Sequence, residues 1–207
     1  MASALTTELD VKPPKPALPG LCLYGDPILR RKSAPIPEIT AEHRDFAAMM
    51  VAAMFEYDGI GLAAPQVGRS LRLVVINTAH CGKGETRPLT PGEMLLNPRM
   101  PVVLLNPEIL SFSRETDVAE EGCLSLPAIH GDVTRPANVV LRAQLLNGDR
   151  VEVPCGGMLA RCLQHEVDHL DGIVFSDRLT DVGFAEVEDR LKALEKETKR
   201  RLKRRGG

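Results

Sequence analysis

The sequence predicts an α+β fold: antiparallel strands packed around a central helix, with one more helix towards each end of the chain. Three observations support this class. A β-hairpin signal covers residues 139–153, a helical pattern covers residues 43–57, and the run His165-Glu166-Val167-Asp168-His169 suits a second helix. Strands that precede and surround one helix favour α+β over a series of βαβ units.

The first helix is expected from His43 to Tyr57, where apolar residues recur at three- and four-residue steps. Thr40 is a candidate N-cap, and His43 takes the position at which a capping box usually has Glu. The pattern stops at Asp58-Gly59, a pair typical of a helix end.

Strands are expected at Leu71–Ile76 and Val102–Leu105, because both segments are short, apolar and β-branched. Between them, Gly82–Gly92 is rich in Gly, Pro and Thr and is expected to be a loop.

The hairpin is the clearest strand signal. Val139–Leu146 and Val151–Val153 flank Asn147-Gly148, a pair that suits a type I′ turn. The helix that carries the two histidines is expected after Gly156-Gly157.

The two ends of the chain differ from its middle. Residues 1–20 are rich in Pro and Lys and are expected to be a disordered lead-in, which leaves 21–182 as the main folded domain. Residues 183–207 are expected to form an amphipathic C-terminal helix with a basic tail. Its apolar stripe contains Phe184, Val187, Leu191, Leu194 and Thr198. Six basic residues and no acidic ones lie between Lys199 and Arg205, so the rest of the chain is acidic.

Composition narrows the class of protein. A chain of 207 residues that is 43% hydrophobic can bury one sizeable core. No stretch approaches eighteen apolar residues, and the first twenty residues resemble neither a secretory signal nor a transit peptide. The five Cys are an odd number at irregular spacing, which suits reduced thiols. A cytoplasmic protein without a membrane span is expected.

The HExxH run is the strongest chemical signal. On a helix, His165 and His169 lie on one face, so both imidazoles can bind one metal ion while Glu166 faces the same site. The alternative is a solvated or core-satisfied pair of histidines. Asp168 is either an exposed helix residue or an anchor paired with Arg135.

A third metal ligand is needed. No His follows His169, so the usual protease arrangement is weakened. Upstream, Cys123 stands between Gly122 and Leu124, where a glycine allows close backbone approach and a thiolate is a strong ligand for a divalent metal. The alternative for Cys123 is a buried small apolar side chain.

A glycine-bounded segment, Gly59–Gly68, holds one amide side chain among small and apolar residues. We expect Gln66 to donate a hydrogen bond into the site.

Together these segments resemble the peptide deformylase family, which has the motifs GxGxAAxQ, EGCxS and QHExDHLxG. This chain matches all three, in the same order, at Gly59–Gln66, Glu121–Ser125 and Gln164–Gly172. Gly25–Arg30 is also typical of the family, so the resemblance covers roughly residues 20–180.

The resemblance implies an iron-dependent hydrolase that removes the formyl group from the initiating methionine of nascent proteins. It implies Cys123, His165 and His169 as metal ligands and Glu166 as general acid and base. It also implies an oxyanion hole made by Gln66 and the backbone N–H of Leu124.

The resemblance also suggests which residues bind the substrate. The expected set is Ile60, Gly61, Glu121, Gly122, Met158, Arg161 and Cys162. Arg161 replaces the aliphatic residue that many bacterial members have, and its guanidinium is expected to extend outward with only its stem in the pocket wall.

The residues leave some choices open. Fe²⁺ is the expected ion, but Zn²⁺, Ni²⁺ and Co²⁺ also suit these ligands. A different metal-dependent peptidase or amidase, and a non-catalytic binding module, are the alternative functions. The expected partners are formyl-methionyl nascent peptides and, through the basic tail, the ribosome, with no membrane and no sequence-specific nucleic acid.

Overall fold

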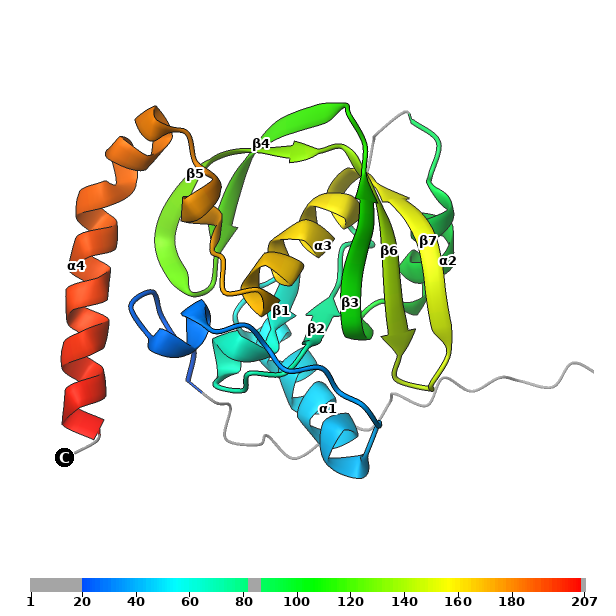
Figure 1. Cartoon of the computed structure of the whole chain (residues 1–207), viewed down its shortest axis with the longest axis horizontal. Coiled ribbons are helices and arrows are strands. Elements are labelled where there is room, and N and C mark those ends of the chain that lie inside the picture. Colours follow the sequence, from blue (N-terminus) through cyan, green and yellow to red (C-terminus); the bar gives the residue numbers. More distant parts are fainter. Residues whose placement is uncertain (1–19, 82–86, 206–207) are drawn as a thin grey trace, which may run out of the picture.

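The computed structural model describes residues 20–81 and 87–205. Its two antiparallel sheets lie on either side of the helix α3 (Gly157–Leu170), as Figure 1 shows. This confirms the expected α+β class of mixed helices and antiparallel strands.

The larger sheet has five strands in the order β1-β2-β3-β6-β7, and every neighbouring pair is antiparallel. Its strands are β1 (Gly61–Ala63), β2 (Leu73–Ile76), β3 (Val102–Phe112), β6 (Asn138–Leu145) and β7 (Arg150–Gly156). Side chains of β2 alternate between two cores: Val74 and Ile76 pack towards α3, whereas Leu73 and Val75 pack towards α1 (Ala41–Glu56). The sheet is therefore covered on both faces.

The smaller sheet pairs β4 (Thr116–Cys123) with β5 (Leu126–Pro136). The register is regular until Gly122 lies opposite His130, and it then shifts at Cys123. This irregularity turns the end of β4 towards α3. The sequence patterns do not single out this sheet.

Helix α1 begins at Ala41, two residues before the expected start. The expected cap is present: the Thr40 hydroxyl accepts a hydrogen bond from the His43 N–H, and the His43 ring accepts one from the Thr40 N–H. Histidine thus replaces Glu in the capping box.

Two local expectations need correction. The loop expected over Gly82–Gly92 ends early, because α2 (Pro91–Leu96) starts inside it, capped by Thr90 and Glu93; residues 82–86 lie outside the described part. The hairpin is present, but φ is positive at Gly148 and not at Asn147, so the turn is not type I′. A longer connection between the strands removes the need for two left-handed residues.

Four 3-10 helices connect these elements. They are η1 (Pro27–Arg30), η2 (Ala64–Val67), η3 (Asn97–Arg99) and η4 (Phe175–Arg178). η2 follows β1 directly and η4 follows α3 within a few residues, so both flank the helix that carries the histidines.

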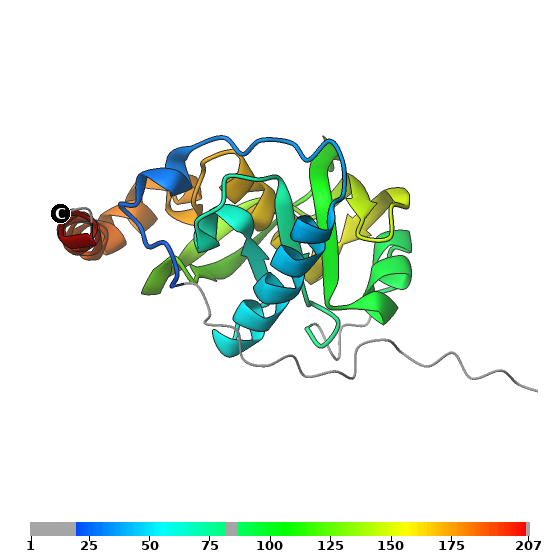
Figure 2. The same ribbon diagram turned by 90° about the horizontal axis from the view of Figure 1, so that it is seen from below.

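The C-terminal helix α4 (Asp181–Arg205) begins two residues before its expected start and lies along one edge of the molecule, as Figures 1 and 2 show. Val187 and Leu191 are buried in a cluster with β5 residues. Phe184 is 37% exposed, so the expected apolar stripe is only partly covered. No helix in the described residues is long and apolar enough to span a membrane. The expected lead-in, apart from Gly20, lies outside the described residues.

Candidate metal centre

Helix α3 carries both histidines and most of its residues are buried. It follows β7 through Gly156, which is extended, and Gly157, whose φ of 54° turns the chain into the helix. The imidazole centroids of His165 and His169 lie 5.0 Å apart. This is the one-turn spacing that HExxH predicts.

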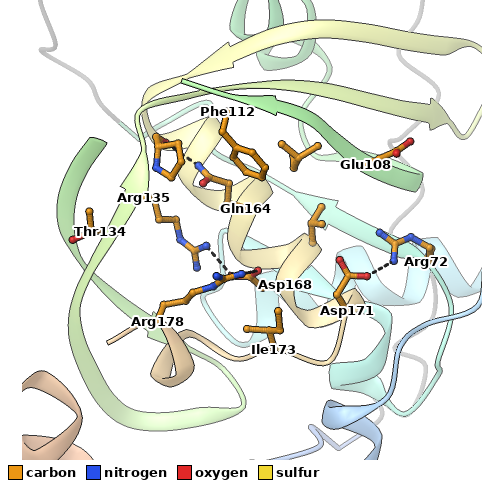
Figure 3. Close-up of a pocket in the computed structure, with 13 residues that line it drawn as sticks. Arg72, Glu108, Phe112, Thr134, Arg135, Gln164, Asp168, Asp171, Ile173 and Arg178 are labelled. Carbon is orange, nitrogen blue, oxygen red and sulfur yellow. Dashed lines mark hydrogen bonds and ion pairs between the residues drawn. The ribbon is translucent and has the colours of Figure 1, made fainter. Parts of the chain in front are cut away.

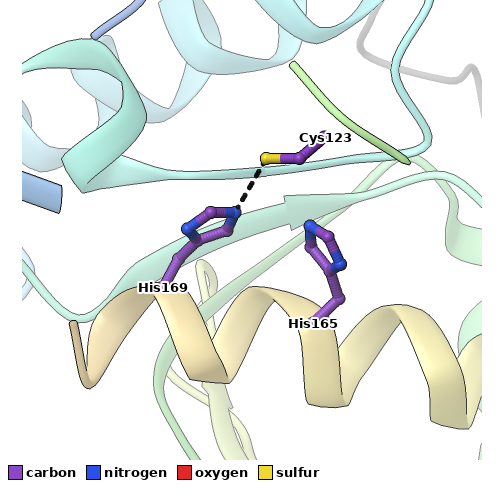
Figure 4. A group of neighbouring side chains, drawn as sticks. All are labelled: Cys123, His165 and His169. Atoms are coloured by element: carbon purple, nitrogen blue, oxygen red, sulfur yellow. Dashed lines mark hydrogen bonds between the residues drawn. The ribbon is translucent and has the colours of Figure 1, made fainter. Parts of the chain in front are cut away.

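Cys123 completes a three-residue group (Figure 4). Its Sγ lies 3.2 Å from Nε2 of His169, and the ligand atoms offered by Cys123, His165 and His169 all lie within 4.8 Å of one another. A thiolate and two imidazoles at this separation can hold a divalent transition-metal ion. The three expected ligands are therefore brought together, from the end of β4 and one face of α3.

His165 is held by Glu121. Nδ1 of His165 lies 2.9 Å from Oε2 of Glu121, which leaves Nε2 to face Cys123. Glu121 also accepts hydrogen bonds from Nε and Nη2 of Arg135, at 2.6 and 2.9 Å, and from Nη1 of Arg161 at 2.8 Å. Burial raises the pKa of Glu121, but the hydrogen bonds from His165 and Arg135 outweigh it and bring the pKa to about 2. Glu121 is therefore a carboxylate at neutral pH.

The two histidines differ in their proton affinity. Burial, followed by the charge of His165, lowers the pKa of His169 well below its usual value, so His169 is a neutral imidazole. Burial also lowers the pKa of His165, but its hydrogen bonds to Cys123 and Glu121 raise it well above the usual value overall.

Glu166 is buried, with 4% of its surface exposed, and its Oε2 has no hydrogen-bond partner in the described structure. Burial raises its pKa to about 7, against the lowering effect of the nearby His165. A Cβ atom at position 61 would lie 2.3 Å from Oε1 of Glu166, so any larger residue at Gly61 would displace the Glu166 carboxyl group. This close approach places the carboxyl group at the wall of the cleft.

Gln66 lies on η2 and is 1% exposed. Its Oε1 accepts a hydrogen bond from the Ala63 N–H at 2.8 Å. Its Nε2 lies 3.4 Å from Sγ of Cys123 and 3.3 Å from Oγ of Ser125. The amide nitrogen therefore faces the metal centre, as expected.

These groups surround a cleft of about 540 Å³. Its walls include all the expected catalytic and substrate-binding residues: Ile60, Gly61, Gln66, Glu121, Gly122, Leu124, Met158, Arg161, Cys162 and Glu166. Cys123 and His165 also line it, whereas His169 is 1% exposed and does not. Burial raises the pKa of the Cys162 thiol well above its usual value, so this side chain is an unreactive part of the wall.

Other residues line the cleft without having been expected there. They are Leu21, Tyr57, Asp58, Gly59, Glu120, Pro127, Ala128 and His130. The position of His130 at the cleft could be predicted only from the pairing of β4 with β5, which places His130 opposite Gly122. Leu21 has no sequence signal, because it belongs to an irregular segment that only the tertiary structure brings to the cleft.

The expected outward extension of the Arg161 side chain is wrong. Its guanidinium does not extend into solvent: the residue is 8% exposed. Besides Glu121, it donates to the carbonyl oxygens of Val133, at 3.0 Å, and Asp117, at 2.8 Å. Glu121 and Val133, which are buried, and Asp117, which is exposed, together satisfy the charge, so outward extension is unnecessary. Its stem lines the cleft while its charged end holds Glu121.

The opposite face of α3 borders a second cavity, of about 450 Å³, shown in Figure 3. There Asp168 accepts hydrogen bonds from Arg135, at 2.8 Å, and Arg178, at 2.6 Å. The pairing of Asp168 with Arg135, one of two alternatives at the level of sequence, is confirmed. Arg135 thus joins the back face of α3 to Glu121 and, through it, to His165.

An α+β fold in which a thiolate and two imidazoles converge beside a cleft that a buried carboxyl group lines is typical of a metal-dependent hydrolase. Comparison with known proteins identifies the family. The family model described as polypeptide deformylase matches residues 20–184. The chain therefore belongs to the polypeptide deformylase family, which confirms the resemblance seen in its motifs.

Individual relatives agree with this family. The chain is 43% identical over 178 residues to peptide deformylase of Opitutus terrae, covering 85% of this chain and 92% of the relative. It is 42% identical over 174 residues to chloroplastic peptide deformylase 1B of Solanum lycopersicum, with 84% of this chain but 57% of that longer protein covered. Among solved structures, Arabidopsis thaliana peptide deformylase 1B in complex with an inhibitor is 36% identical, with a TM-score of 0.74 and coverages of 87% and 92%.

Proposed function

We infer that this chain is a peptide deformylase: it hydrolyses the N-formyl group of the N-terminal methionine of newly synthesised proteins and releases formate. Family membership supports the activity. The observation that carries it within the structure is the Cys123–His165–His169 group, whose members Cys123 and His165 line one cleft together with Glu166.

The residues present fit one divalent metal ion. Sγ of Cys123 and the two imidazoles converge, while Glu121 fixes the ring of His165 from outside the group. We propose Fe²⁺ as the ion, although Zn²⁺, Ni²⁺ and Co²⁺ suit the same ligands. When bound, the ion would polarise a carbonyl oxygen and make water more acidic.

Glu166 moves the proton in this proposal. Its carboxylate accepts a proton from the attacking water and gives it to the departing amine nitrogen. A pKa of about 7 supports both roles, because the group is able to accept and to release a proton near neutral pH. Its unpartnered Oε2 leaves an oxygen available for this exchange.

Gln66 and the backbone N–H of Leu124 stabilise the oxygen that becomes negatively charged. The Gln66 amide is oriented by Ala63, and Leu124 directly follows Cys123 at the cleft. Each such donor typically contributes about 3 kcal/mol to transition-state stabilisation.

The methionine side chain binds against Ile60, Met158, Cys162 and the stem of Arg161. Gly61 and Gly122 line the cleft beside the proposed metal ligands. A narrow mouth between them would admit a formyl group, whose carbon carries only hydrogen, more easily than a longer acyl group.

The following peptide adds as a strand. In the described structure, β1 pairs only with β2 and β4 only with β5, so each presents an edge at the cleft. Main-chain hydrogen bonds would then give affinity with little side-chain preference after the methionine.

We further propose that α4 helps the enzyme meet nascent chains at the ribosome, in the cytoplasm. One surface depression on this helix is bordered by Glu195, which pairs with Lys199, and by five basic residues: Lys192, Lys196, Lys199, Arg200 and Lys203. Ribosomal RNA offers phosphates to such a surface, and the attraction would weaken with added salt. The catalytic domain is proposed to span residues 21–182 and the helix with its tail 183–207.

Formate release tests the activity. The protein is purified without oxygen, its metal content is measured, and it is given formyl-Met-Ala-Ser or unblocked Met-Ala-Ser. We expect formate from the first peptide and no cleavage of the second. Cleavage of the unblocked peptide alone would favour another peptidase, and metal uptake without any turnover would favour a binding protein.

A further inference from the structure

We propose that the hydroxyl group of Ser125 is a positioning group for the reaction: it orients the Gln66 amide so that one amide hydrogen points into the cleft. This role rests on the proposed function, because it acts through the Gln66 oxyanion donor. The Ser125 side chain itself does not line the cleft.

Two contacts fix the Gln66 amide at its two ends. The Ala63 N–H donates to its Oε1, so the amide cannot flip without losing that bond. Oγ of Ser125 lies 3.3 Å from its Nε2. Gln66 is 1% exposed and Ser125 is fully buried, so water does not replace the serine as a partner.

The Gln66 amide nitrogen contacts both the serine and a proposed metal ligand. Nε2 of Gln66 lies 3.4 Å from Sγ of Cys123, nearly the distance to Ser125. A primary amide has two N–H hydrogens. The serine accepts one, and the other is directed towards Sγ of Cys123 at the wall of the cleft. Without the serine, the amide is free to turn further towards the sulfur.

The backbones of the two residues are tied together independently of the hydroxyl. Residues 22 and 24 belong to one segment that runs beside both: the Cys22 N–H donates to the Gln66 carbonyl, and the Tyr24 N–H donates to the Ser125 carbonyl, both at 2.8 Å. Removing Oγ should therefore change the amide orientation without separating η2 from the β4–β5 turn. This makes Ser125→Ala a clean probe.

The test compares four proteins in the formate-release assay: wild type, Ser125→Ala, Gln66→Ala and the double variant. We expect Ser125→Ala to lower kcat about 10- to 100-fold, with KM changed less than about threefold and an unchanged metal content. In the Gln66→Ala background, Ser125→Ala should lower kcat only slightly, because the amide through which the serine acts is gone. Ser125→Thr retains the hydroxyl and should recover most of the lost kcat.

Ser176→Ala is the matched control. Ser176 is also buried, at 2% exposure, and its Oγ has no hydrogen-bond partner in the described structure. Its loss should leave kcat unchanged.

Three results would overturn the role while leaving the deformylase activity in place. They are a Ser125→Ala enzyme with normal kcat, an equal loss in both Gln66 backgrounds, and a thermal midpoint lowered so far that lost folding explains lost activity. A wild-type protein that releases no formate would instead overturn the proposed function, and the Ser125 role with it.

Discussion

The buried polar groups on the two faces of α3 differ in whether they have hydrogen-bond partners. On the back face, Asp168 accepts from two arginines. On the cleft face, Oε2 of Glu166 and Nδ1 of His169 are buried without a hydrogen-bond partner in the described structure. Buried polar atoms are nearly always paired, so unpaired ones need an explanation. The paired groups on the back face fix the position of the helix, whereas the unpaired groups on the cleft face remain available for the reaction.

Arg135 links the two faces. It binds Asp168 on one side and Glu121 on the other, and Glu121 holds His165. The back face therefore supports His165, one of the three proposed metal ligands.

The largest effect is expected on the cleft face. His169→Ala removes one of three ligands, so bound metal should be lost and formate release should fall below detection. Because the imidazole leaves no broken ion pair behind, the metal-free protein should unfold at nearly the wild-type temperature. Metal analysis and thermal unfolding of the metal-free proteins measure this; full metal content in the variant would contradict it.

The next effect is on the back face. Arg135→Met should lower the free energy of unfolding by about 3 to 5 kcal/mol, because it removes the buried cation that Glu121 and Asp168 share and leaves Asp168 with only the half-exposed Arg178. Arg178→Met is the control: its side chain is 44% exposed, and Asp168 keeps Arg135, so the loss should be below about 1 kcal/mol. Equal losses in denaturant unfolding would show that burial does not set the difference.

The rate at which air inactivates the enzyme should depend on which metal ion is bound. If Fe²⁺ is bound through the Cys123 thiolate, air should oxidise both and inactivate the enzyme. The Ni²⁺-substituted enzyme should keep its activity about tenfold longer or more, because Ni²⁺ is not readily oxidised. Half-lives in aerated buffer test this, and equal half-lives would speak against iron.

A smaller effect concerns Glu93, an ion-paired carboxylate on α2 whose partners Arg87 and Thr90 lie beside the start of α3. Burial raises the pKa of Glu93, but hydrogen bonds from Arg87 and Thr90 bring it down to about 2. Ionised Glu93 thus stabilises the fold above its ordinary pKa of 4.5, and this is lost as pH falls from there to about 2. Glu93→Gln should therefore lose a few degrees less in unfolding temperature over that range than wild type or Glu56→Gln.

Much of the candidate site could be predicted from the sequence, because its signals are local. The helical spacing of His165 and His169 follows from helix geometry, and Cys123 and Gln66 stand in short glycine-bounded segments. These four side chains are brought together as expected.

The rest depends on tertiary contacts. Arg161 reaches Glu121, forty residues away in sequence, and nothing local to either residue indicates that the two meet. The pairing of β4 with β5 was missed because its strands carry many polar residues and no strong apolar alternation. The start of helix α2 does have a sequence signal, because Thr90-Pro91-Gly92-Glu93 is a capping box with proline at the first helical position. The Gly and Pro residues of the surrounding segment suggest a loop, so this signal was overlooked.

The central claim is that Glu166 on the cleft face moves protons and is not a ligand. Glu166→Gln keeps the shape of the side chain and removes its ability to accept a proton, and Glu120→Gln is a control at the same cleft. The measurement is metal content together with formate release from formyl-Met-Ala-Ser. We predict a Glu166→Gln protein with the wild-type amount of metal and turnover lowered about 10²- to 10⁴-fold. Near-normal turnover, or loss of the metal along with the activity, would contradict the claim.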